Sequence, residues 1–266
     1  MKISFLTLFP DIIQNYISTG LLARAQSNSF FDFEILNIRD AVTKNYKSAD
    51  DTVYGGADGV LLQYEPLVQT LSKVNRDEKA KVIYLSPQGE QLNQSLINEL
   101  RNEKHLVLVS GRYAGIDERF ISKHVDLEIS IGDYVLCGGE LPSLVLVETL
   151  SRQIPGVLGN NESARNDSFV QGLLEAPQFT KPAEVDGMKV PATLMSGDHK
   201  NIEAWKKDMS VLVTLKKRED LIEPRSKEIN WKQIEIFYKN LSIEDKTLLN
   251  INNLDLQIAK HKNRTS

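Results

Sequence analysis

The sequence has few of the features that mark secreted or membrane proteins. Its single cysteine, Cys137, excludes an internal disulfide bond, which is typical of a reducing compartment, and we expect this residue to be packed. No apolar run approaches the ~18 residues that a membrane-spanning helix needs, and the N-terminus lacks the layout of a signal peptide. We therefore expect a cytoplasmic protein with no membrane partner.

Several common ligand motifs are also absent. No G-x-G-x-x-G follows the first strand pattern, which argues against an ordinary dinucleotide or Rossmann-methylase site, and there is no Walker A sequence. No cluster of carboxylates indicates a metal site. The net charge of −4 is unlike that of a general nucleic-acid binder, although residues from Gly172 onward hold 16 Lys and Arg against 14 Asp and Glu.

The sequence does contain an alternation of strand and helix patterns. Such an alternation predicts an α/β domain with a largely parallel sheet. Strands are predicted at 2–8, 33–38, 81–86, 106–110 and 125–129, and helices at 11–26, 65–74, 93–101 and 141–150, the first of them capped by Asp11.

The later sequence predicts two further parts. Residues 154–172 are rich in Pro, Gly and Asn and read as a linker, so the first domain is expected at 1–153. Residues 173–266 are expected to form a small helical domain, with Trp205 and Trp231 as core anchors. Within the first domain, residues 39–59 show no periodicity and predict a long polar loop.

Three predicted loops follow strands, at 85–89, 110–113 and 130–142. Ligands of open α/β sheets bind beyond the carboxyl ends of the strands, so these loops predict a ligand site. The third loop has three glycines in eight residues, which admit close main-chain contact with a ligand such as an adenine. For this loop alone, a glycine-rich turn without a ligand is an equal alternative.

Several segments resemble one family, the bacterial tRNA (guanine-N1)-methyltransferases of the SPOUT class. They occur in one order across residues 1 to about 220. They are Y-G-G at 54–56, V-I-Y-L-S-P-Q-G at 82–89, G-R-Y at 111–113, G-I-D-E-R at 115–119, S-I-G-D-Y-V-L-C-G-G-E-L-P at 130–142, S-R at 151–152, I-P-G-V-L-G at 154–159, D-S-F at 167–169 and S-G-D-H at 196–199.

The resemblance implies a fold, a reaction and partners. It implies a largely parallel sheet with a C-terminal trefoil knot that holds S-adenosylmethionine, and a homodimer with active sites shared between subunits. It also implies methylation of guanine N1 at tRNA position 37, 3′ of the anticodon, tRNA binding by the helical domain, and possible use of Mg²⁺. The implied cofactor-binding residues are Leu85, Ser86, Pro87, Gly111, Tyr113, Ile131, Gly132, Asp133, Tyr134, Val135, Leu136, Gly138 and Gly139.

The same resemblance assigns the catalytic pair. Guanine N1 carries a proton and is a poor nucleophile until a general base removes it, and the resemblance gives this role to Asp167. Arg152 is assigned to stabilise the charge that develops on O6. Without the resemblance, Asp167 reads as a helix cap and Arg152 as a partner of a helix C-terminus.

Two departures from the family pattern keep alternatives open. Ala114 stands where the family usually carries Glu, and Ala57, Asp58 and Val60 stand where it has Gly, Pro and Met. The first puts in question how the methionine end of the cofactor is held, with Asp133 a possible substitute, and the second concerns tRNA contacts. The alternatives are a SPOUT methylase with another RNA target and a catalytically weakened knotted RNA-binding protein.

Overall fold

The computed structural model describes residues 1–42, 48–56, 59–75, 80–158 and 167–265. The chain divides into two compact units, Met1–Asn161 and Glu162–Ser266, and the division falls inside the segment predicted as a linker. Ala57, Asp58 and residues 159–166 of that linker lie outside the described residues.

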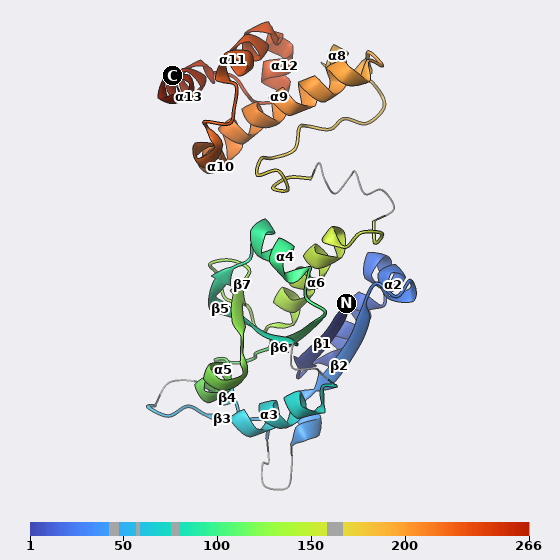
Figure 1. Ribbon diagram of the computed structural model, residues 1–266, viewed down its shortest axis with the longest axis vertical. Coiled ribbons are helices and arrows are strands. Elements are labelled where there is room, and N and C mark those ends of the chain that lie inside the picture. The colour runs from blue at the N-terminus through green and yellow to red at the C-terminus, as the bar shows by residue number, and fades with distance from the viewer. Residues whose placement is uncertain (43–47, 57–58, 76–79, 159–166, 266) are drawn as a thin grey trace. The chain divides into compact units, whose positions relative to one another are not determined.

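The first unit is built on a sheet of five parallel strands in the order β2-β1-β6-β5-β7 (Figure 1). This confirms the predicted α/β class with a parallel sheet. The strands are β1 (Lys2–Thr7), β2 (Asp32–Asn37), β5 (Lys81–Gln91), β6 (His105–Ser110) and β7 (Leu127–Ser130).

Alternate residues of the strands point into two separate hydrophobic cores, as the period of two in a strand requires. On β6, Leu106 and Leu108 enter one core and Val107 and Val109 enter the other. A sheet buried on both faces explains why its strands read as continuous apolar runs. The first core is covered by α1 (Pro10–Ile17), α2 (Gly20–Ser27), α4 (Gln94–Leu100) and α6 (Glu140–Gln153).

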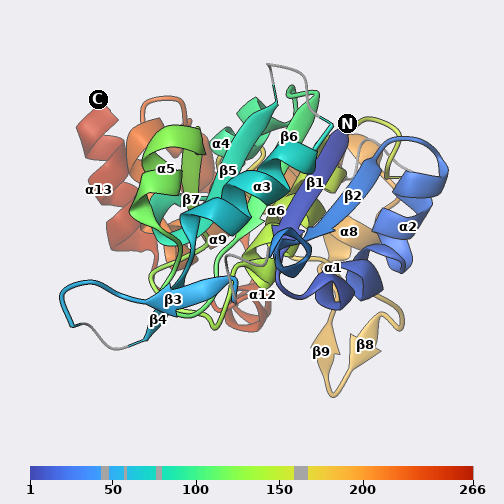
Figure 2. The ribbon, with the colours of Figure 1, turned by 90° about the horizontal axis from the view of Figure 1, so that it is seen from below.

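The opposite core is covered mainly by α3 (Tyr64–Lys73) and α5 (Glu118–His124), which lie in front of the strands in Figure 2. The described residues of the predicted loop at 39–59 include most of η1 (Ile38–Ala41) and all of β3 (Asp50–Thr52), so they contain regular structure that was not predicted. Ile38 of η1 and Leu62 of β4 (Val60–Leu62) also enter this core, and β3 forms an antiparallel pair with β4.

The prediction of one helix over 11–26 was wrong. The chain forms α1 and α2 instead, and Gly20 separates them with a φ of +59°, a conformation that glycine adopts readily. Asp11 lies in the first turn of α1 and does not cap it, because Phe9 occupies the cap position and Pro10 begins the helix.

The prediction that the strand at 81–86 ends in a loop was also wrong. β5 continues to Gln91, and its register against β7 shifts between Leu85 and Glu90, which both lie opposite Ile129. Residues 86–89 therefore form a bulge within a strand. Gly89 permits this bulge, because a Cβ there would lie 2.4 Å from the carbonyl carbon of Glu128.

The second unit is helical, as predicted. Trp205 and Trp231 are buried in its core, which confirms them as its anchors. Its elements are β8 (Glu184–Val185), β9 (Met188–Lys189), α8 (Ala192–Met195), α9 (His199–Lys217), α10 (Glu219–Ile222), η2 (Glu223–Arg225), α11 (Trp231–Asn240), α12 (Ile243–Leu248) and α13 (Asp255–Thr265). None of the helices in the described ranges combines the length and apolar character needed to cross a bilayer.

The bulge gives a test of strand packing. We expect Gly89→Ala to destabilise the β5–β7 pair by about 1–3 kcal/mol, because the added Cβ forces the two backbones apart. Hydrogen exchange of the β5 and β7 amides measures this change. The control is Glu90→Ala, an exposed neighbour on the same strand, for which we expect a change of about 0.5 kcal/mol or less. Equal protection in Gly89→Ala and the control would contradict the packing argument.

Candidate functional site

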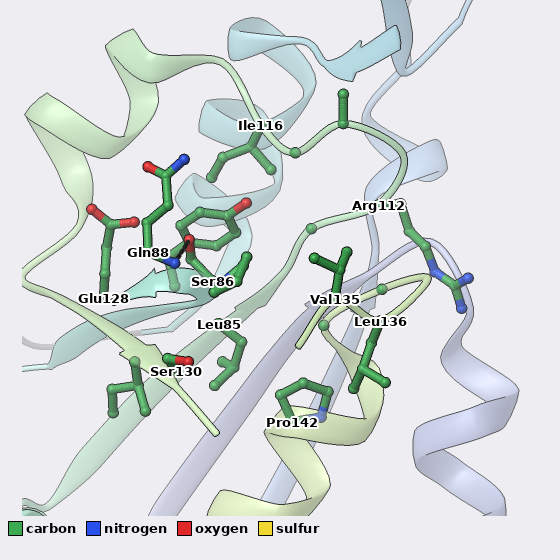
Figure 3. A pocket seen from close by; sticks show the side chains of 18 of the residues that line it. Leu85, Ser86, Gln88, Arg112, Ile116, Glu128, Ser130, Val135, Leu136 and Pro142 are labelled. Carbon is green, nitrogen blue, oxygen red and sulfur yellow. Dashed lines mark hydrogen bonds between the residues drawn. The ribbon is translucent and has the colours of Figure 1, made fainter. Parts of the chain in front are cut away.

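A cavity of about 430 Å³ lies at the carboxyl edge of the parallel sheet, and we call it the edge cavity. Three segments line it, namely the β5 bulge, the loop that follows β6 and the loop that follows β7, together with Pro142 of α6 (Figure 3). The three segments that were predicted to form a ligand site therefore meet around one space.

The loop after β6 curves over the ring of Tyr84. A Cβ on Gly111 would lie 2.8 Å from the Tyr84 hydroxyl oxygen, so a larger residue would displace the ring or the loop. Tyr113 adopts a φ of +60° within this turn. Hydrogen bonds to β4 fix the loop from outside, with Ala114 N–H donating to the Val60 carbonyl at 3.1 Å.

The loop after β7 is attached to the loop after β6 through backbone contacts. Arg112 and Gly138 form an antiparallel bridge, and Gly139 N–H donates to the Gly111 carbonyl at 2.9 Å. A Cβ on Gly139 would lie 2.7 Å from Ser110 Cα. A substitution of Gly139 would therefore break this loop contact first, whatever ligand occupies the edge cavity.

Glu140, the first residue of α6, anchors these loops to the sheet. Its carboxylate is 1% exposed and accepts hydrogen bonds from Thr7 Oγ1 at 2.7 Å and from Arg112 Nε at 3.0 Å. The Arg112 guanidinium also lies over the Phe9 ring, 4.3 Å from its centroid, in a cation–π contact. Arg112 is thus committed to Glu140 and Phe9, and its side chain turns away from Gln88 and Glu128 in Figure 3.

The phenol of Tyr84 lies in a strongly perturbed environment. Burial raises its pKa to about 12, and the negative charges of Glu128 and Glu118 add to the increase, while a hydrogen bond from the Ile116 backbone opposes it. Tyr84 is therefore a neutral hydrogen-bonding group at physiological pH.

The structure brings together most of the residues predicted to bind the cofactor. Twelve of the thirteen line the edge cavity; the exception is Asp133, which is exposed and does not line it. Cys137 lines the cavity and is exposed, so the prediction of a packed cysteine was wrong. Its place in a loop held by backbone bonds explains why no packing is required of its side chain.

The two predicted catalytic residues do not line the edge cavity. Arg152 is exposed in the last turn of α6, in the first unit. Asp167 belongs to the second unit, where it is half-buried and its carbonyl accepts a hydrogen bond from Val170 N–H at 3.3 Å. Within the described residues, no group of three or more His, Cys, Asp or Glu side chains is arranged to hold a metal ion.

Sequence reasoning missed the polar residues that shape the edge cavity. Tyr84, Glu118 and Glu128 line it, and Glu140 holds Arg112, another lining residue, by a hydrogen bond. For Glu140 a signal existed, since an acidic residue directly after Gly-Gly at the start of an apolar helix is favoured by the helix dipole. For Glu128, the alternation within β7 alone does not tell which face carries a cavity.

Comparison with known proteins gives consistent matches. Residues 1–224 match the model of a protein family described as tRNA (guanine-1)-methyltransferase TrmD. A tRNA (guanine-N(1)-)-methyltransferase of Shewanella loihica is 46% identical over 225 residues, which cover 84% of this chain and 91% of the relative. Proteins of the same name from Clostridium perfringens and Pseudomonas fluorescens are each 44% identical, covering 84% and 85% of this chain and 94% and 91% of the relatives.

The raised pKa of Tyr84 predicts a late step in an alkaline titration. Because the folded pKa exceeds the ordinary value of 10.0, the folded state holds the proton more tightly. Its contribution to stability is complete below about pH 10 and falls as pH rises towards 12, by at most about 1.4 kcal/mol per pH unit. Ultraviolet titration of phenolate should show this step in the wild type and not in Tyr84→Phe. Tyr54→Phe, which removes a phenol that is 98% exposed, should keep it; loss of the step in both variants would contradict the assignment.

Proposed function

Since the chain belongs to the TrmD family of tRNA (guanine-1)-methyltransferases, it is an enzyme that methylates N1 of guanosine 37 in tRNA, and we propose that the edge cavity holds its methyl donor, S-adenosylmethionine. The observation that carries this placement is the meeting of three loops, distant in sequence, around one cavity at the carboxyl edge of the sheet.

The residues present fit the donor. A cavity of about 430 Å³ is within the usual range for small-molecule sites. Leu85, Val135, Leu136 and Pro142 give it an apolar side that suits an adenine ring, and Gln88 and Glu128 give it a polar side (Figure 3). The glycines of the loop after β7 leave backbone groups open to a ligand's edge.

Methyl transfer requires activation of the acceptor, guanine N1, but not of the methyl donor. When bound, S-adenosylmethionine supplies an electrophilic methyl group whose leaving group is a neutral thioether, so no acid is needed. In this proposal Asp167 accepts the N1 proton of guanine as general base, and the Arg152 guanidinium stabilises the charge that spreads to O6. The proposal assigns no role to Mg²⁺.

The covalent chain allows Asp167 to act at a cavity in the first unit. Fourteen residue steps separate it from Gln153, the last residue of α6, and an extended chain of that length spans at most about 50 Å. α6 begins at Glu140 beside the edge cavity and is about 21 Å long, so this reach exceeds the length of the helix. The proposal therefore treats 154–172 as the linker that delivers the base and 173–266 as the tRNA-binding domain.

We also propose that the segments around the edge cavity form a trefoil knot. Support comes from the attachment of the loop after β7 to the loop after β6, through the Arg112–Gly138 bridge and the close approach of Gly139 to Ser110. Two loops attached in this way hold a bent ligand between them. Knots are rare among folds, so this proposal rests chiefly on family membership.

The exposed faces of α1 and α6 suggest where a second subunit packs. Ile12, Tyr16, Leu141 and Val145 are between 37% and 57% exposed on these two helices, which contact each other. Apolar side chains gathered on one face mark an interaction surface. We propose that this face is the self-complementary interface of a homodimer, and that the dimer shares its active sites between subunits.

A charge placed on this face tests the dimer. We expect Val145→Glu to yield a monomer in light scattering, because the interface would bury an unpaired carboxylate. The matched control is Leu256→Glu on α13, which is 84% exposed and should leave the dimer intact. A wild-type protein that is monomeric at micromolar concentration would overturn the proposal.

A substitution of the proposed base tests the catalytic assignment. We expect Asp167→Asn to lower the single-turnover methylation rate by about 100-fold or more, because the amide keeps the shape but loses the basicity. The affinity for S-adenosylmethionine should stay nearly unchanged, since the effect belongs to the transition state. Asp133→Asn serves as control, and a rate loss in it alone would transfer the role of base to Asp133.

The function itself is tested on tRNA transcripts. The protein should form N1-methylguanosine on a transcript with guanosine at position 37 and on none with adenosine there. Product is measured by nucleoside analysis after digestion. Methylation of another site, or of ribosomal RNA alone, would favour a methylase with a different RNA target. Binding of the donor without product would favour a knotted RNA-binding protein.

A further inference from the structure

Two carboxylates, Glu118 and Glu128, line the edge cavity. Glu128 is on β7 and stands directly opposite Tyr84 of β5 in the parallel register, so both side chains share one face of the sheet. Glu118 is the first residue of α5, which covers that face. Figure 3 shows Glu128 beside Gln88, across the cavity from Val135 and Leu136.

These carboxylates lack protein counter-ions in the part of the chain that the structure describes. Arg119, the residue after Glu118, gives its guanidinium to Asp117 through Nε at 2.8 Å and through Nη2. Arg112, the only Lys or Arg among the described residues that line the cavity, pairs with Glu140 at 3.0 Å. The edge cavity is therefore negatively charged at one end.

The phenol of Tyr84 reports the same field. Burial is the main cause of its raised pKa, and the charges of Glu128, which is half-buried, and of Glu118, which is exposed, raise it further. Asp133, the acid that the sequence suggested for holding the charged end of the cofactor, is exposed and does not line the cavity. Ala114 lines the cavity with a methyl group only.

We propose that Glu118 and Glu128 make the edge cavity select the sulfonium form of the cofactor over the neutral thioether that remains after methyl transfer. This inference rests on the proposed placement of the cofactor. Donor and product share the adenosine and amino-acid groups and differ by one methyl group and one positive charge. An unpaired carboxylate near that charge favours the donor and not the product, which speeds exchange of product for donor.

The test compares the affinities of S-adenosylmethionine and S-adenosylhomocysteine by calorimetry in the wild type, Glu128→Gln and Glu118→Gln. For Glu128→Gln, which removes a half-buried charge, we expect the Kd of the donor to rise on the order of 3- to 10-fold. For Glu118→Gln we expect a smaller rise, because Glu118 is exposed and solvent screens its charge. The Kd of the product should change less than about twofold, because its sulfur is neutral. The matched control is Glu90→Gln, an exposed residue of β5 that does not line the cavity and should shift neither Kd.

Three other outcomes would contradict the proposal, and they distinguish the selectivity from the placement of the cofactor. Equal weakening of donor and product would mean that the carboxylates only support the fold. Unchanged affinities in a doubly substituted Glu118→Gln and Glu128→Gln protein, with its circular dichroism intact, would refute the selectivity. A wild type that binds neither compound would overturn the placement of the cofactor itself.

Discussion

The buried carboxylate of Glu140 holds the edge cavity together. A charge that is 1% exposed costs several kcal/mol unless it is paired, and its partners, Thr7 and Arg112, come from the end of β1 and the loop after β6. Arg112 in turn bridges to Gly138 in the loop after β7. Loss of Arg112 would leave the buried Glu140 carboxylate without its counter-ion, so the loop after β6 is held in place at the start of α6.

Much of the fold was predictable because burial on two faces leaves a strong pattern in sequence. Every strand of the sheet overlaps a predicted apolar run, and Asn93 marks the start of α4 by accepting a hydrogen bond from Leu96 N–H at 3.0 Å. The errors arose where a single glycine decides the geometry. Gly20 divides one apolar helix pattern into two helices, and Gly89 keeps a segment rich in turn residues inside a strand.

The candidate site was predictable only in part. The loops after β6 and β7 were found because glycines and strand ends can be recognised in a sequence, whereas the third predicted loop is a bulge inside β5. These three segments carry the predicted cofactor residues. The negative charge of the cavity lining was not predicted. Glu118 and Glu128 act on Tyr84 only because of the strand register and the packing of α5. The roles of Asp167 and Arg152 rest on family membership, because a base supplied by a separate unit leaves no local pattern in either unit.

The placement of the two tryptophans confines the chain's indole fluorescence to one of its two units. Trp205 and Trp231 are both buried in the second unit, and Trp231 stacks on His261 with the ring centroids 4.9 Å apart. The first unit contains no tryptophan. Indole emission excited at the red edge of the absorption band therefore comes from the helical unit alone, and the first unit contributes nothing to it. Events at the edge cavity reach this signal only if they are transmitted to the second unit, which makes the native chain a sensor of coupling between its parts.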